Sequence, residues 1–138
     1  MPLRRDKKVE LIKGVPLFSR CSKKELQEVA ALADEIDLPE GRVLTREGDT
    51  GHEFFVILEG TAEVRHGGRK VRTLGPGDFL GEIALLTQLP RTATVTATTA
   101  LDVLVITARE FRSLLAHAPK VQTKVLEALA ERLAATTL

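Results

Sequence analysis

A chain of 138 residues, 43% of them apolar and 28% charged, has the size and composition of one soluble globular domain. Its 20 Lys and Arg residues nearly balance its 19 Asp and Glu residues, and the formal net charge of +1 gives no indication of nucleic-acid binding. No apolar run reaches the roughly 20 residues of a membrane-spanning helix, and the N-terminus lacks the apolar core of a signal peptide. The single Cys21 cannot close an internal disulfide, so we expect a cytoplasmic protein without a membrane span.

Two short helices are predicted in the N-terminal segment, residues 1–33. The first covers residues 6–13 and is ended by Gly14. The second begins at Ser22, because Glu25 three positions later completes a capping-box pattern. The apolar residues that follow recur at the spacing of one helical face. We therefore expect this segment to be helical and to bury one side of the second helix.

The pattern changes at residue 34, where short β-rich runs begin to alternate with turns. Residues 54–58, Phe-Phe-Val-Ile-Leu, form a continuous apolar run that is typical of a strand buried on both faces. The pair Gly67-Gly68 separates two further runs and indicates a two-residue hairpin. Seven or eight such strands with turns at nearly regular intervals predict an antiparallel β-roll of the jelly-roll type across residues 34–106.

The C-terminal segment, residues 107–138, returns to helical patterns. Thr107 and Glu110 repeat the capping-box spacing, and Pro119 suits the first turn of a last helix. That helix carries an apolar stripe, made of Val121, Val125, Leu126, Leu129 and Leu133. The predicted fold class is therefore mainly β with flanking helices, in a single domain over residues 1–138.

The most informative stretch is residues 79–94, inside the predicted β-roll. Gly81 opens a turn, and the residues after it can form one short helix whose first N–H groups attract an anion. Arg91 offers a planar fork of donors that can pair with two phosphate oxygens. Glu82 is acceptor-only when ionised, so it suits a sugar hydroxyl and not a phosphate. One charge of each sign fits a nucleotide with a compact phosphate beside its ribose.

A simpler alternative is an ion pair between Glu82 and Arg91 that ties a loop to a strand. An ion pair does not require Gly, Glu, Ala, Pro, Arg and Ala together in this order. The stretch G-E-I-A-L-L-x-x-x-P-R-T-A-T, residues 81–94, closely resembles the phosphate-binding cassette of cyclic nucleotide-binding domains. The resemblance extends over residues 15–133. It implies N-terminal helices, a β-roll that holds the cassette with its short helix, and two closing helices.

The resemblance assigns roles to the residues of the cassette. It implies that Glu82 holds the ribose 2′-hydroxyl and that Arg91 neutralises the cyclic phosphate. Small side chains in the cassette allow the ligand to approach the backbone closely. The backbone N–H groups implied to complete the phosphate cradle are those of Gly81, Ile83, Ala84 and Ala93.

Contacts to the base are implied at three positions. Val64 and Leu74 lie where the roll of the family contacts the purine, although each is equally consistent with a core residue. Thr92 follows the arginine, and relatives with a hydroxyl there often accept cGMP. Many cAMP binders carry such a residue too, and a threonine that faces solvent is the plain alternative. We expect cAMP as the principal ligand and cGMP as a second ligand.

The last helix of the family acts as a lid over the base. Arg132 and Leu133 stand at positions that could reach the base. The alternative is that the apolar stripe of this helix packs on the roll or on a second copy of the chain, as such stripes usually do. A homodimer through the C-terminal helix is therefore a further expectation.

The resemblance implies a cyclic-nucleotide sensor that repositions its C-terminal helix, not an enzyme, and it implies no metal or other cofactor. A cupin-like β-roll is one alternative, but such a site needs clustered His and carboxylate ligands. The three histidines, His52, His66 and His117, are scattered along the chain. The other alternative is a ligand-free association module, which would have no need of both Glu82 and Arg91.

The expected partners are a cyclic nucleotide and an effector domain or protein that the sequence does not identify. Related domains are attached to kinases, ion channels, transferases or helix-turn-helix regulators. The sequence ends at residues 134–138, soon after the expected lid, so we expect no DNA-reading segment to follow. The sequence does not decide between a free-standing receptor and a part of a longer protein.

Overall fold

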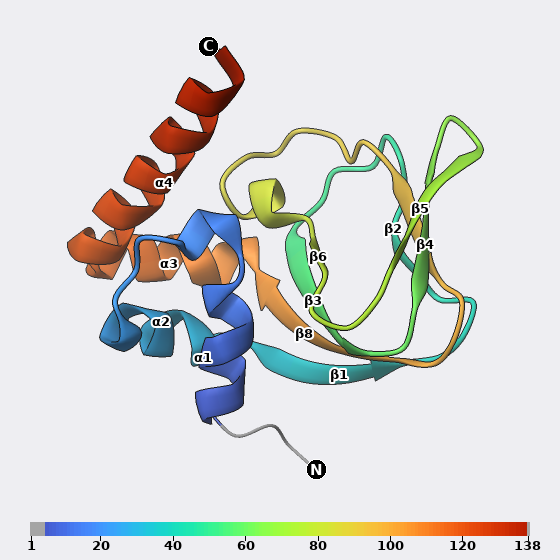
Figure 1. Cartoon of the computed structure of the whole chain (residues 1–138), viewed down its shortest axis with the longest axis horizontal. Coiled ribbons are helices and arrows are strands. Elements are labelled where there is room, and N and C mark those ends of the chain that lie inside the picture. The colour runs from blue at the N-terminus through green and yellow to red at the C-terminus, as the bar shows by residue number, and fades with distance from the viewer. Residues whose placement is uncertain (1–4, 138) are drawn as a thin grey trace. The chain divides into compact units, whose positions relative to one another are not determined.

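The computed structural model describes residues 5–137, which form two compact units (Figure 1). The helical unit comprises residues 5–33 and 110–137, and the strand unit comprises residues 34–109. Among the described residues, no helix has both the length and the apolar character that a membrane crossing requires.

The helical unit is built from α1 (Arg5–Lys13), the 3₁₀ helix η1 (Pro16–Phe18), α2 (Lys23–Ala30), most of α3 (Ala108–His117) and α4 (Pro119–Thr137). The rings of Phe18 and Phe111 meet edge to face with centroids 5.6 Å apart, and both side chains are fully buried. The apolar stripe predicted for the last helix is buried only in part. Val121 and Val125 are 1% exposed, whereas Leu126 and Leu133 are exposed.

The start of α2 confirms the predicted capping box. Glu25 donates its backbone N–H to the Ser22 hydroxyl at 3.2 Å, and Ser22 donates its own N–H to the Glu25 carboxylate at 2.7 Å. Both donors would otherwise be left without a partner in the first turn of the helix. The Ser22 hydrogen bonds lower the pKa of the Glu25 carboxyl, because they favour its ionised form.

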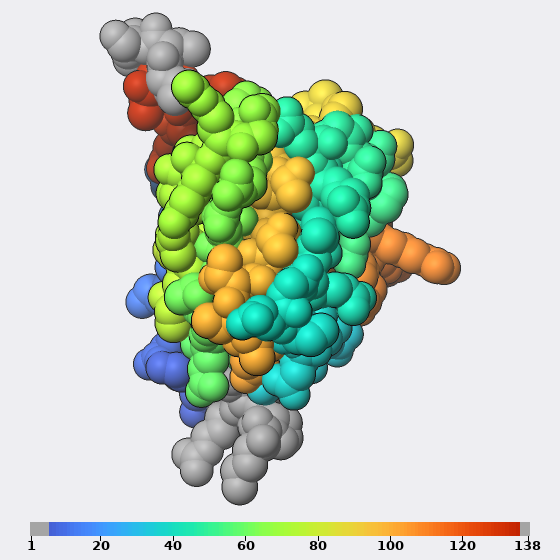
Figure 2. Space-filling model, turned by 90° about the vertical axis from the view of Figure 1, so that its right-hand side faces the viewer, coloured from blue at the N-terminus to red at the C-terminus, as the bar shows by residue number. Residues whose placement is uncertain are grey.

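The strand unit holds eight antiparallel strands in two four-stranded sheets, which confirms the predicted β-roll. One sheet has the order β1-β8-β3-β6, with β1 (Asp34–Leu38), β8 (Leu101–Thr107), β3 (Glu53–Glu59) and β6 (Phe79–Leu80). The other has the order β2-β7-β4-β5, with β2 (Val43–Thr45), β7 (Thr94–Ala97), β4 (Ala62–His66) and β5 (Arg69–Leu74). Figure 2 shows this second sheet face on, with β7 between β2 and β4.

Side chains from both sheets form the core of the roll. The first sheet contributes the middle of β3 and β8, and the second contributes β4, β5 and β7. The central residues of β3 are buried on both faces, as their continuous apolar run predicts. The core residues are Phe55, Ile57, Ala62, Leu74, Val95, Ala97, Leu101, Val103 and Val105.

The predicted hairpin joins β4 and β5 through Gly67 and Gly68. Their φ angles are 58° and 80°, both in the left-handed region that a type I′ turn requires of its two central residues. The short strand β6 was not predicted. Its two residues, Phe79 and Leu80, pair with β3 directly before the cassette and thereby fix where the cassette begins.

Candidate functional site

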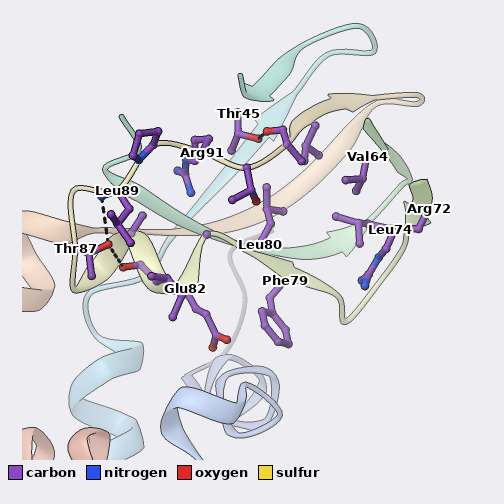
Figure 3. Close-up of a pocket in the computed structure, with 17 residues that line it drawn as sticks. Thr45, Val64, Arg72, Leu74, Phe79, Leu80, Glu82, Thr87, Leu89 and Arg91 are labelled. Carbon is purple, nitrogen blue, oxygen red and sulfur yellow. Dashed lines mark hydrogen bonds between the residues drawn. The ribbon is translucent and has the colours of Figure 1, made fainter. Parts of the chain in front are cut away.

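A cavity of about 430 Å³ opens in the strand unit, between the two sheets and the cassette (Figure 3). Residues of β4, β5, β6, η2 and the loop before β7 line it, together with Thr45 of β2 and Val95 of β7. A volume of this size lies within the range that small-molecule sites usually have. All seven predicted cassette residues line this one cavity, and so do Val64 and Leu74.

The cassette begins with one tight helical turn, as predicted, and the turn is of the 3₁₀ type. Gly81 caps it at φ 82° and ψ 17°, and η2 follows over Glu82–Leu85. The N–H of Ala84 donates to the carbonyl of Gly81 at 3.0 Å and closes the turn. The Thr87 hydroxyl then donates to the carbonyl of Ile83 and accepts from the N–H of Leu89, which folds the loop back on the turn (Figure 3).

Arg91 is held by both its main chain and its side chain. Its N–H donates to the carbonyl of Asp49 at 2.7 Å, and its carbonyl accepts from the N–H of Gly48 at 2.8 Å. The Nη2 atom donates to the carbonyl of Glu53 at 2.6 Å. Burial lowers the pKa of the Arg91 guanidinium, and the nearby Glu53 charge opposes that change. The guanidinium stays protonated, because arginine does not lose its proton in proteins.

Glu82 is one of the residues that line the cavity, but its carboxylate is turned away from Arg91. Figure 3 shows the carboxylate on the opposite side of the cassette ribbon from the Arg91 side chain. The residue is only 7% exposed, and its Oε2 atom has almost no contact with solvent. The described structure therefore does not bring the charged ends of Glu82 and Arg91 together. For the carboxylate to reach a hydroxyl in the cavity, its side chain has to rotate.

The far end of the cavity is formed by β4 and β5. Leu74 is 2% exposed, and Val64 is half-buried, so both present apolar surface to the cavity. Arg72 also lines this end, and the sequence analysis did not single it out. Its Cα partner in the ladder is Val64, and Leu74 lies two positions further along β5. Strand alternation puts all three side chains on one face, and this signal could have identified Arg72.

A sequence model of the cyclic nucleotide-binding domain matches residues 35–118, which is more than half of the chain. The chain belongs to the cyclic nucleotide-binding domain family. In this cyclic nucleotide-binding domain, the matched residues include the complete strand unit from Glu35 onward and the whole cassette.

Two curated relatives show how the domain is used in longer proteins. The chain is 33% identical over 123 residues to a cyclic nucleotide-gated potassium channel of Rhizobium etli, and the alignment covers 89% of the chain and 34% of the channel. It is 43% identical over 100 residues to the cAMP-dependent protein kinase regulatory subunit of Mycosarcoma maydis, which covers 67% of the chain and 18% of that subunit. The chain thus spans about a third or less of the length of these relatives.

Solved structures support the fold. The N-terminal domain of a transcriptional regulator from Streptomyces coelicolor superposes with a TM-score of 0.83 at 31% identity, and the match covers 92% of both chains. A cyclic nucleotide-binding domain from Methylobacillus flagellatus superposes with a TM-score of 0.77 at 27% identity, covering 96% of this chain and 78% of that one.

The segment after Arg91 is tied to the neighbouring strands in this domain. The Thr45 hydroxyl donates to the carbonyl of Ala93 at 3.0 Å. The Nδ1 atom of His66 lies 2.7 Å from the carbonyl oxygen of Thr92, so the imidazole donates this hydrogen bond. Thr92 itself is exposed at the rim of the cavity. These two contacts fix the backbone through which Arg91 and Ala93 face the cavity.

The predicted lid residues lie outside this cavity. Arg132 and Leu133 are on α4 of the helical unit, where both are exposed, whereas the residues that line the cavity all belong to the strand unit. A contact between α4 and a bound ligand therefore stays a prediction. Within residues 5–137, the His, Cys, Asp and Glu side chains form no group of three or more that could hold a metal ion.

Proposed function

We propose that the cavity binds a purine 3′,5′-cyclic nucleotide, with cAMP as the principal ligand. The observation that carries the proposal is the Arg91 guanidinium, held in place at one end of a cavity whose other end presents the apolar Val64 and Leu74 beside Arg72. A cyclic nucleotide has the matching division between an anionic phosphate and a flat base. Membership of the family supports the same ligand class.

Arg91 would neutralise the cyclic phosphate. Its guanidinium has five N–H donors, and the carbonyl of Glu53 takes one of them at 2.6 Å. A phosphate oxygen pair suits the remaining fork, and partial burial strengthens the attraction because less water screens it. Backbone N–H groups around Gly81, Ile83 and Ala93 would add neutral donors to the same oxygens. The N–H of Ala84, also expected in this cradle, donates to the carbonyl of Gly81 in the ligand-free chain.

Glu82 would hold the ribose 2′-hydroxyl. An ionised carboxylate accepts hydrogen bonds and cannot donate them, so it selects a hydroxyl over a phosphate. This role requires the side chain to turn from the position shown in Figure 3. Glu82 already belongs to the residues that line the cavity, so a rotation of its side chain would be enough.

Arg72 gives a specific reason to test cGMP as a second ligand. It lines the cavity on the same strand face as Val64 and Leu74, the residues expected to contact the base. Guanine presents two adjacent acceptors, O6 and N7, which match an arginine fork, whereas adenine presents a donor beside its N7. Thr92 at the rim could add a hydrogen bond to the guanine amino group.

The output of binding would be a change in the position of the C-terminal helix. A ligand can shift that helix only if it binds one arrangement better than the other. The named relatives are a channel and a kinase regulatory subunit, so we propose that the domain acts as a regulatory sensor and not as an enzyme. The effector would be a further domain or a separate protein in the cytoplasm.

A thermal-shift screen with cAMP, cGMP, cyclic dinucleotides and 5′-AMP tests the ligand class. At a concentration of about 100 times Kd, a ligand adds about 2.7 kcal/mol to stability, which raises the Tm of such a domain by roughly 10 °C. We expect this rise with cAMP and a smaller one with cGMP. Absence of a shift with every cyclic mononucleotide would refute the proposal.

A further inference from the structure

The Arg91 side chain passes through a narrow slot between two glycines, Gly51 and Gly81. A Cβ atom at Gly51 would lie 2.7 Å from Cδ of Arg91 and closer still to its Nε and Cζ. A Cβ at Gly81 would lie 2.6 Å from the carbonyl oxygen of Glu53 and closer still to Nη1 of Arg91. Real Cβ atoms essentially never approach neighbours within 3.0 Å, so both positions exclude any larger residue while Arg91 stays in place.

The two glycines differ in what else requires them. Gly81 has φ 82°, and a side chain there would be strained whatever the space around it. Gly51 is not among the glycines with positive φ, so its backbone is not in the left-handed region that favours glycine. Gly51 is buried, and the nearest atoms that its Cβ would meet all belong to the Arg91 side chain. The Arg91 contact is therefore the steric reason for glycine at position 51.

The main chain keeps Gly51 and Arg91 in register. Arg91 exchanges backbone hydrogen bonds with Gly48 and Asp49, and Thr50 forms an isolated antiparallel bridge with Pro90. Two residues after Gly51, the carbonyl of Glu53 accepts the Nη2 hydrogen bond. One segment, the loop over residues 48–52 with the first residue of β3, thus supplies a side wall and a hydrogen-bond acceptor for the guanidinium. That arrangement fixes which edge of the fork faces the cavity.

We propose that Gly51 is a positioning residue for anion binding: the absence of a side chain at this position lets Arg91 lie in the slot and present its guanidinium to the phosphate. The proposal rests on the proposed function of the cavity. Gly51 touches the Arg91 side chain and acts on the ligand only through it. A methyl group at position 51 would force the guanidinium out of the slot and away from the Glu53 carbonyl.

The ligand-free test is a double-mutant cycle in urea unfolding, with the parent, Gly51→Ala, Arg91→Ala and the double variant. We expect Gly51→Ala to lower the urea midpoint in the parent. In the Arg91→Ala background the midpoint should stay or rise, because alanine reduces the entropy of the unfolded chain. Gly75→Ala is the matched control, since a Cβ there meets nothing within 4 Å and Gly75 is not among the glycines with positive φ.

Equal losses in both backgrounds would overturn the proposal, because they would show a role for Gly51 that does not involve Arg91. If the Gly51→Ala variant does not fold but the double variant does, the result supports the proposal that Gly51 makes room for Arg91. If neither variant folds, the proposal is overturned.

The binding test uses cAMP with the same variants. We expect Gly51→Ala to weaken cAMP binding about 30-fold or more, which is the lower end for loss of a buried charge partner. Gly75→Ala should bind within about twofold of the parent, a range that leaves room for indirect effects. A Gly51→Ala variant that binds cAMP as tightly as the parent would overturn the proposal. If the parent binds no cyclic nucleotide, the proposed function fails, and the urea cycle still decides whether Gly51 positions Arg91.

Discussion

Asp102 is predicted to destabilise the strand unit at neutral pH. It lies on β8 and pairs across the sheet with Asp37 of β1 on one side and Glu59 of β3 on the other. Its Oδ1 atom is buried. Burial raises the pKa of the Asp102 carboxyl from 3.8 to about 6, and so do a hydrogen bond with Glu35 and the charges of Glu35, Asp37 and Glu59.

The sign of the effect follows from proton binding. Between the pKa of the unfolded chain, 3.8, and that of the folded one, about 6, the folded state binds more protons. The contribution of Asp102 to stability therefore falls as the pH rises through this window, and above the window the full destabilisation by its ionised carboxylate is present. The pKa difference corresponds to about 3 kcal/mol at most. Solvent reaches part of this group of acidic side chains and screens their charges, so we expect the ionised Asp102 to lower the free energy of unfolding by about 1–2 kcal/mol at pH 7.

Urea unfolding of the Asp102→Asn variant at pH 4, 5, 6 and 7 measures this contribution. We expect the variant to gain about 1–2 kcal/mol over the parent at pH 7, and the gain should shrink toward pH 4 as the parent carboxyl protonates. Asp34→Asn is the control, because Asp34 is an exposed acid on β1. If Asp102→Asn gains no more than the control at pH 7, or gains equally at every pH, the reasoning is wrong.

Two further predictions concern single side chains. Replacing Glu82 with Gln should weaken cAMP binding about tenfold in calorimetry, because an amide accepts a hydrogen bond from a ribose hydroxyl less strongly than a carboxylate does. The parent should bind 2′-deoxy-cAMP as weakly as the variant binds cAMP, and equal affinity of the parent for cAMP and 2′-deoxy-cAMP contradicts the ribose role. Burial and the Glu25 charge raise the pKa of Cys21 to about 11. At pH 8 the native thiol should therefore react with iodoacetamide at least about 100-fold more slowly than the thiol of the urea-unfolded chain, and equal rates would contradict this.

The sequence predicted those parts of the fold that depend on local patterns. The apolar run at residues 54–58 became the buried β3, the Gly67-Gly68 pair became a hairpin turn, and Ser22 with Glu25 became a capping box. Each depends on residues close together in the chain, where periodicity and turn preference act directly. The cassette turn was predictable for the same reason.

Contacts between distant segments could not be predicted in this way. Gly51 and Arg91 are 40 positions apart, and only the antiparallel pairing of their loops brings them together. Alternation with Leu74 could have placed Arg72 on the cavity face, but its pairing with Val64 depends on an irregularity in the β4–β5 ladder that the sequence does not reveal. The direction of the Glu82 carboxylate depends on rotamer choice, which the sequence pattern does not fix.

Arg91 is proposed to bind the phosphate of a cyclic nucleotide in the cavity of the strand unit. Calorimetric titration of cAMP into the parent, Arg91→Ala and Arg109→Ala tests it most directly, because Arg109 is an exposed arginine that does not line the cavity. We predict one cAMP site in the parent, the same affinity in Arg109→Ala, and a loss of about 2–5 kcal/mol in Arg91→Ala. An Arg91→Ala variant that binds cAMP as tightly as the parent would contradict the account.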